Sequence, residues 1–262
     1  QNQEEANQFK IDHSIVLALT PATVEISNKV AVEAALAAYD LLSTEAQTLL
    51  ASEKALLDSL LLEIQAQEAI TLEVSGFQTD QAGPLALTTG TVQISDKASV
   101  EAALAAYDLL STEAQALLAT EKALLDSLLV EIQAQEAIAL EVSTFQSDHA
   151  TPLALTTGTV QISDKASVEA ALAAYDLLST EAQTLLASEK ALLDSLLLEI
   201  QAQEAIALEV STFQTDQAGP LALTTGTVQI SDKTAVEAAL AAYNLLSTEA
   251  KALLATEKAL LD

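Results

Sequence analysis

The sequence predicts an all-α protein built from tandem helical-bundle repeats of 68 residues. Two observations carry the prediction of repeats. Residues 69–136 and 137–204 differ at only eight of 68 positions. The aromatic residues form two series with the same spacing: Tyr39, Tyr107, Tyr175 and Tyr243, and Phe9, Phe77, Phe145 and Phe213. Helical spacing of apolar residues inside each repeat supplies the fold class. A fixed period of this length is typical of an array of small modules.

The period divides the chain into four repeats: residues 1–68, 69–136, 137–204 and a truncated 205–262. Length alone would favour one or two domains, and the period overrides that expectation. A lone module of this size is marginally stable, so neighbouring repeats are expected to support one another. Because the chain starts at Gln1 and stops inside a helical pattern at Asp262, we expect it to be part of something longer.

The first helix of a repeat is predicted from the second copy. Its apolar face is formed by Val100, Ala103, Leu104, Tyr107 and Leu110. Abundant alanine raises the helix propensity of the remaining positions. Ser95 and Asp96 precede this helix as candidate N-caps, with Ile94 as the apolar residue that packs back on the first turn.

Two helix breaks are possible after this helix. Thr112 and Gln115 have the spacing of a capping box, which predicts that a helix starts or kinks there. The same pair recurs at Thr44 and Gln47 and at Thr180 and Gln183, whereas the fourth copy has Lys251 at the glutamine position. The second candidate is the segment 119–121, which contains Thr120. The sequence leaves the choice between the two breaks open.

A long helix is predicted next, because no glycine or proline occurs between Ser111 and Thr151. A helix of some 30–35 residues would span ~50 Å and would pass from one repeat into the next, which gives a rod-like array. The alternation of Ile138, Leu140 and Val142 leaves a β-strand open as the alternative.

Each repeat also contains a segment of low helix propensity, residues 82–95 in the second copy. It holds Pro84, Gly90 and several threonines. We expect an extended connector that lays apolar side chains on the helices, whether or not it pairs as a strand. These side chains are Leu85, Leu87, Val92 and Ile94. Pro152 and Pro220 hold the place of Pro84, and the first copy has Pro21 instead.

The charge excludes several partners. The net charge is −28 and the chain has no arginine, whereas binding to a phosphate backbone needs cationic side chains. Nucleic acid and anionic membrane surfaces are therefore not expected as partners. No apolar run approaches the ~20 residues of a membrane-spanning helix, so no membrane insertion is expected. The absence of cysteine is compatible with an oxidising extracellular environment.

No catalytic, cofactor or metal site is predicted, and the protein is not expected to be an enzyme. His13 and His149 occupy a repeat position that holds Gln81 and Gln217 in the other copies, so we interpret them as exposed connector residues. The chain contains no cysteine nucleophile, Gly-x-Ser-x-Gly motif, glycine-rich phosphate loop or Asp-rich calcium loop. Tyr107 is expected in the core. Lys122 and Asp126 are expected to pair on a solvated helix face.

The first copy carries a family resemblance. Its relevant residues are Leu19-Thr20-Pro21-Ala22-Thr23-Val24-Glu25-Ile26, Val32-Glu33-Ala34-Ala35 and Ala37-Ala38-Tyr39-Asp40 with Leu42-Ser43. They resemble a tandem three-helix repeat of large surface proteins and adhesins from Gram-positive and related bacteria. The resemblance implies small three-helix modules in an extracellular stalk. The usual arginine of that family is replaced by Leu36, Leu104, Leu172 and Leu240.

Three functions remain open on these grounds. The leading hypothesis is a structural spacer in the stalk of a bacterial surface protein, whose partners are the neighbouring repeats of its own chain. A self-assembling subunit of an extracellular filament or sheath is the first alternative. It follows from a leucine face that three short helices would not fully bury. The second is a multivalent adhesin module with an unknown host or surface ligand. A surface strip of non-core residues shared by all copies would favour it.

Overall fold

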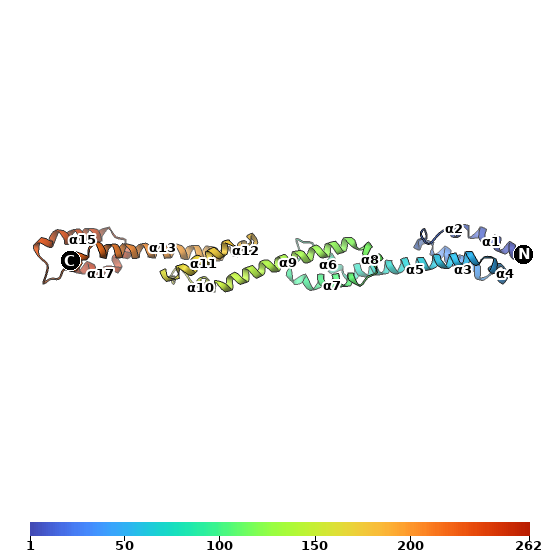
Figure 1. Cartoon of the computed structure of the whole chain (residues 1–262), viewed down its shortest axis with the longest axis horizontal. Coiled ribbons are helices and arrows are strands. Elements are labelled where there is room, and N and C mark those ends of the chain that lie inside the picture. Colours follow the sequence, from blue (N-terminus) through green and yellow to red (C-terminus); the bar gives the residue numbers. More distant parts are fainter. The chain divides into compact units, whose positions relative to one another are not determined.

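The computed structural model describes residues 1–262, and every regular element in it is a helix (Figure 1). The prediction of an all-α chain is confirmed. The β-strand alternative for Ile138, Leu140 and Val142 is wrong, because all three lie inside the helix Ala119–Asp148. The chain forms two compact units, Gln1–Gln135 and Glu136–Asp262.

Three helices are 30 residues long, within the predicted range of length. They are α5 (Ala51–Asp80), α9 (Ala119–Asp148) and α13 (Ala187–Asp216). The boundary between the two units falls within the range of α9. The first and last helices of the chain are shorter, namely α1 (Asn2–Asp12) and α17 (Ala255–Leu261).

The long helices pack against helices of intermediate length, as α3 does on α5 and α11 on α13. These are α3 (Lys29–Asp40), α7 (Lys97–Asp108), α11 (Lys165–Asp176) and α15 (Lys233–Leu245). Each is followed by a short helix: α4 (Thr44–Leu49), α8 (Thr112–Leu117), α12 (Thr180–Leu185) and α16 (Thr248–Leu253).

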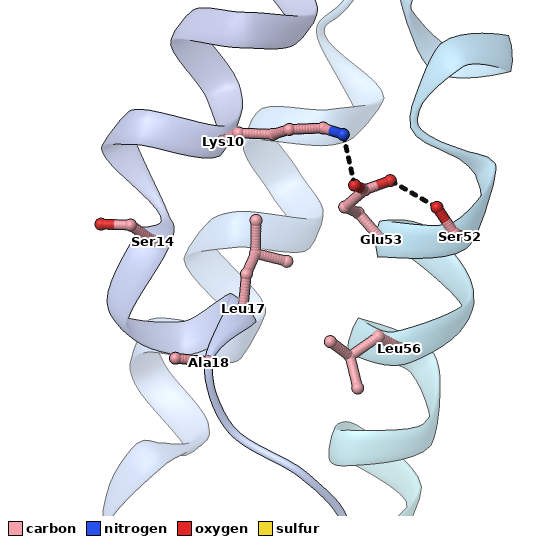
Figure 2. Close-up of a pocket in the computed structure, with 7 residues that line it drawn as sticks. All are labelled: Lys10, Ser14, Leu17, Ala18, Ser52, Glu53 and Leu56. Carbon is pink, nitrogen blue, oxygen red and sulfur yellow. Dashed lines mark hydrogen bonds and ion pairs between the residues drawn. The ribbon is translucent and has the colours of Figure 1, made fainter.

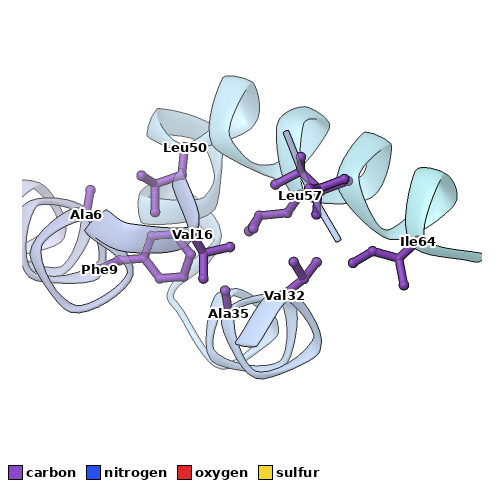
Figure 3. Close-up of a cluster of buried hydrophobic side chains, with 10 residues drawn as sticks. Ala6, Phe9, Val16, Val32, Ala35, Leu50, Leu57 and Ile64 are labelled. Carbon is purple, nitrogen blue, oxygen red and sulfur yellow. The ribbon is translucent and has the colours of Figure 1, made fainter. Parts of the chain in front are cut away.

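Each unit contains two hydrophobic clusters. Figure 3 shows the first, in which Phe9 of α1, Val32 and Ala35 of α3, and Leu57 and Ile64 of α5 point toward one another. In the second cluster, Leu118, Leu125, Leu128 and Ile132 have no exposed surface. Full burial of such a side chain contributes about 1.5–3 kcal/mol. The first core also includes Val16 of the turn α2 (Ser14–Leu17) and Val24 of the connector.

The helix α5 takes part in both clusters of the first unit. Leu57 and Ile64, in its first half, belong to the first cluster, and Phe77, near its end, belongs to the second. The helix α13 has the same role in the second unit, with Ile200 in one cluster and Phe213 in the other. In each unit, one continuous helix thus supplies core residues to two clusters. Whether four repeats fold as separate parts stays a prediction.

The predicted capping box at Thr112 and Gln115 is wrong. The N-cap of α8 is Ser111, whose Oγ accepts a hydrogen bond from the backbone N–H of Ala114. Its extended backbone, with φ −61° and ψ 154°, places the hydroxyl over the first turn. Gln115 instead donates a hydrogen bond to the backbone carbonyl of Tyr107, 3.0 Å away.

Both candidate helix breaks are present. The first lies at Ser111, before α8, and the second at Leu118, between α8 and α9. Leu118 has φ −98° and ψ 18°, outside the helical range. Its side chain is fully buried. The buried leucine therefore lies at the bend where the short helix meets the long one.

The prediction of an extended connector at residues 82–95 is only partly correct. Residues Ala82–Leu85 form a helical turn, α6, and Ile94–Asp96 form a 3-10 turn, η2. The other copies contain the same turns: α2 (Ser14–Leu17), α10 (Ala150–Leu153) and α14 (Ala218–Leu221), with η1 (Ile26–Asn28), η3 (Ile162–Asp164) and η4 (Ile230–Asp232). Pro84 fits because the first turn of a helix needs no N–H at that position.

The apolar side chains of this segment are divided between core and surface. Val92 is 3% exposed, whereas Ile94 is 41% exposed and lies in the turn η2, which contacts α7. The carboxylate of Asp96 accepts the backbone N–H of Gln93 and so caps the 3-10 turn. Of the two predicted N-cap candidates, Asp96 is the N-cap residue of α7, but its side chain does not cap that helix.

Candidate functional site

A glutamate on the long helix is bonded to the N-cap serine of the short helix in the following segment. The Ser111 N–H and Oγ–H donate to Glu73 Oε2 at 2.9 and 2.7 Å. Ser179 donates in the same way to Glu141. These hydrogen bonds stabilise the carboxylate and hold the pKa of Glu73 below its ordinary value. Because the contact recurs wherever the repeat recurs, its role is structural.

The tyrosines belong to the core, as expected. Tyr107 Oη donates to the carbonyl of Gln115 at 2.8 Å, and its ring lies edge-on to Phe77. Lys122 Nζ lies 2.6 Å from Asp126 and 5.9 Å from the centre of the tyrosine ring. The predicted lysine–aspartate pair is therefore present, with a cation–π contact added. A tyrosine with these partners is a packing residue.

The two histidines are not exposed connector residues. His13 is half-buried, with its ring 4.7 Å from that of Phe9, and His149 is half-buried against Phe145 at 4.9 Å. Each follows the last residue of a helix. In the first and third copies the histidine ring therefore contacts the phenylalanine ring. In the second and fourth copies this position is occupied by Gln81 and Gln217.

One pocket contains the charged pair that is special to the first copy. It has a volume of about 430 Å³, and Figure 2 shows Lys10 of α1 reaching Glu53 of α5, with 2.6 Å between Nζ and Oε1. The hydrogen bond from Lys10 lowers the pKa of Glu53. In the second copy Gln78 donates to Glu121 at 2.7 Å in the same place. Lys10 and Glu53 thus bridge two helices in the same way as the glutamine–glutamate pairs of the other copies.

Another pocket, of about 420 Å³, lies beside α17 and is lined by residues that include Pro220, Val228 and Leu261. Val228 is half exposed here, whereas the equivalent Val92 is buried. In the second copy, Ile132 of α9 belongs to the same cluster as Val92.

A third kind of opening occurs at the same place in three copies, and we call it the recurrent groove. Its volumes are about 460, 470 and 480 Å³. In the second copy Leu72, Glu73, Phe77 and Asp80 of α5 face Leu110, which follows α7. In the third copy the equivalent residues are Leu140, Glu141, Phe145, Asp148 and Leu178. In the fourth copy they are Leu208, Glu209, Phe213, Asp216 and Leu246. A volume of this size lies within the range of ligand pockets.

The lining of the groove combines apolar and acidic side chains. Phe77 is buried beneath it, while Leu72 stands 73% exposed at the edge. The two carboxylates are the only charged groups in the lining of the second copy. The first copy differs, because Glu4 occupies the position of Leu72.

Large aliphatic side chains are exposed at further repeated positions. Leu109 is 87% exposed, and its equivalents Leu41, Leu177 and Leu245 are exposed to the same degree. Other exposed series are Leu49, Leu117, Leu185 and Leu253, and Leu62, Val130 and Leu198. From the leucine face that the sequence predicted, Leu118, Leu125 and Leu128 are buried and Leu117 is not. Two series of exposed leucines, those of Leu109 and Leu117, therefore recur in all four copies. We call these series the shared strip.

The structure shows neither a candidate metal site nor a candidate membrane span. No group of three or more histidine, aspartate and glutamate side chains is arranged to hold a metal ion. None of the helices combines the length and the apolar character that a bilayer crossing requires. Some groups with shifted pKa values, such as Glu73 and Lys29, bond to another helix. Others, such as Lys122, pair within their own helix.

The fold defines an all-α protein of the helical-bundle class. No protein-family model, no curated protein and no solved structure matches the chain. The family resemblance of its first copy therefore stays a prediction.

The sequence pattern did not reveal the recurrent groove. Leu72 and its equivalents lie in an apolar helix where many leucines are buried, and periodicity alone does not say which of them lack a partner. A usable signal was present, because the position is leucine in three copies and Glu4 in the first. A core position would not accept that exchange.

Proposed function

We propose that the chain is a non-enzymatic structural spacer, part of the stalk of an extracellular bacterial surface protein. One observation carries this proposal. The same interior contacts recur from copy to copy, and no constellation of reactive groups occurs in one place only. Each added copy of the repeat lengthens the array without adding a new kind of surface or reactive site. The resemblance of the first copy to stalk repeats and the absence of cysteine support the extracellular location.

The stiffness of the spacer would come from helices shared between repeats. The helices α5 and α13 each supply core residues to two clusters, and 30 residues at 1.5 Å per residue span about 45 Å. A helix that is packed at both ends resists bending between the two cores. We infer that the four tandem repeats form an elongated, rod-like array with a shared helix at each junction.

Small-angle X-ray scattering of the full chain over a dilution series tests this proposal. A thin monomeric particle well over ~100 Å long is the expected result. A compact particle would exclude the stalk. Comparison of the unfolding of one 68-residue copy with that of the whole chain tests the coupling, because equal stability would show that neighbours do not support one another.

A self-assembling filament subunit is the second candidate, and the exposed leucine series favour it. Contiguous exposed apolar surface usually marks an interaction site. In scattering experiments, a particle whose cross-section grows with concentration would support lateral association of rods. A mass that stays constant on dilution would count against it. The shared strip also supports the third candidate, a multivalent adhesin module, because equal surfaces on linked copies raise avidity.

A further inference from the structure

We propose that the recurrent groove of the second, third and fourth copies docks a cationic amphipathic helix of a partner protein. The proposed sites are therefore three per chain. This proposal does not depend on the spacer function, because it concerns a surface that each of the three copies presents, whatever the length of the array.

The groove has the form that a docked helix requires. One wall is formed by α5, where Glu73, Phe77 and Asp80 follow helical spacing and Leu72 lies beside them, and the lining is completed by Leu110. A helix laid in such a groove would add a fourth helix to the local bundle and would cover Leu72, which is otherwise exposed. Helix-in-groove recognition uses apolar anchors at i, i+3, i+4 and i+7 in this way.

The charge of the groove selects a cationic partner. Glu73 and Asp80 both lie on the α5 wall, and no lysine lines the groove. Glu73 Oε2 also accepts hydrogen bonds from Ser111. The third copy has the same two carboxylates, at Glu141 and Asp148, with His149 beside them. A helix with lysines or arginines beside its apolar face would meet these carboxylates along one side of the groove. Complementary potentials of this kind steer association and exclude wrong partners.

A second copy of this chain is a poor occupant for the same reason. Each chain carries a net charge of −28 and has no arginine, so two chains repel each other. Several lysines are already paired within the chain, for example Lys122 with Asp126 and Lys165 with Glu204. The partner is therefore expected to be of opposite charge.

The experiment uses calorimetric titration of the full chain, at ~0.15 M salt to screen long-range attraction. The probe is a peptide of ~14 residues, about four helical turns, with leucines on one face and lysines on the other. A peptide of the same composition in scrambled order is the first control. We expect three amphipathic peptides to bind per chain and the scrambled peptide to bind at least about tenfold more weakly.

The chain offers a matched pair of variants. Leu72→Glu, Leu140→Glu and Leu208→Glu together place in each groove the residue that the first copy has at Glu4. Leu62→Glu, Val130→Glu and Leu198→Glu add the same charge at exposed positions outside the groove. Simple charge attraction would strengthen binding in both. We expect the first variant to lose binding about tenfold or more and the second to retain it.

Asp80→Asn, Asp148→Asn and Asp216→Asn provide a test that leaves the apolar lining intact. This variant should bind several-fold more weakly and should show a smaller dependence on salt. Three results would overturn the proposal: no binding by the unmodified chain, equal binding of the scrambled peptide, or equal losses in the two glutamate variants. A concentration-dependent mass that the Leu72→Glu set abolishes would instead assign the groove to a second copy.

Discussion

At the residue scale, the clearest feature is a serine that serves two partners. Ser111 caps α8 through its Oγ and also donates that hydroxyl and its N–H to Glu73 on another helix. The hydroxyl both accepts and donates, which threonine or asparagine could not do in the same geometry without added bulk. The sequence offered Thr112 one position later as the cap. The backbone of Ser111 is extended, which places its hydroxyl, and not that of Thr112, at the N-cap position.

Removal of these caps should destabilise every copy. Replacement of Ser43, Ser111, Ser179 and Ser247 by alanine should lower the free energy of unfolding by about 1 kcal/mol per copy, because one helix N–H loses its acceptor. Urea unfolding measures the change. Replacement of Ser59, Ser127 and Ser195 by alanine is the control, since these hydroxyls bond only to carbonyls of their own helix. The control should be neutral or stabilising; equal losses would contradict the capping role.

The same contact predicts a response to acid. The hydrogen bonds from serine lower the pKa of Glu73, Glu141 and Glu209 below 4.5 in the folded chain. A depressed pKa means that the stabilisation is complete above the unfolded value and is lost as pH falls through the folded value. Stability should therefore decrease below about pH 4.5.

This loss must be separated from the relief of charge repulsion, which acts in the opposite direction. The variant Glu73→Gln, Glu141→Gln and Glu209→Gln keeps acceptors in place but does not titrate. Urea midpoints of the unmodified chain and the variant should converge as pH falls from 7 to 3. A constant difference over this range would show that the carboxylates do not contribute through their charge.

At the element scale, α5 determines how the first unit holds together. Its first half packs with α3, and Phe77 in its last turns packs with Tyr107 of α7. The sequence predicted an uninterrupted helix from the next repeat, where no glycine or proline occurs between Ser111 and Thr151. The helix α5 contains Gly76 and still continues to Asp80. Which of its many leucines face a partner depended on the helices that pack against it.

A break in this helix should separate the two clusters of the first unit. Ala66 is exposed near the middle of α5, so Ala66→Pro disrupts the backbone without opening a core. We expect a loss of about 3 kcal/mol and an additional unfolding transition in urea. Ala66→Gly should cost only about 1 kcal/mol and leave the number of transitions unchanged. If both variants unfold in the same way, the helix does not couple the clusters.

At the scale of the whole molecule, negative charge and exposed leucine act against each other. The net charge of −28 keeps chains apart at neutral pH, while Leu109 and its equivalents present repeated apolar contact points. The balance of the two determines whether the chains associate.

Neutralisation should shift that balance toward association. The isoelectric point is near 4.1, so light scattering should show a rising mass as pH falls from 7 toward ~4.5 at fixed concentration. The variant with glutamine at Leu41, Leu109, Leu177 and Leu245 should associate less, because it titrates identically but lacks the apolar side chains. Equal association of the two proteins would exclude this series as the contact.

The amino-acid sequence by itself determined the helical class, the period and the long helices, because alanine and leucine at helical spacing act through local backbone preferences and burial of one face. Tertiary structure decided what depends on a partner. It selected Ser111 as the cap, formed turns in the segment 82–95, buried Val92 while leaving Ile94 exposed, and left Leu72 beside an open groove. A repeat pattern states which side chains are apolar, but only the neighbouring helices decide which of them are covered.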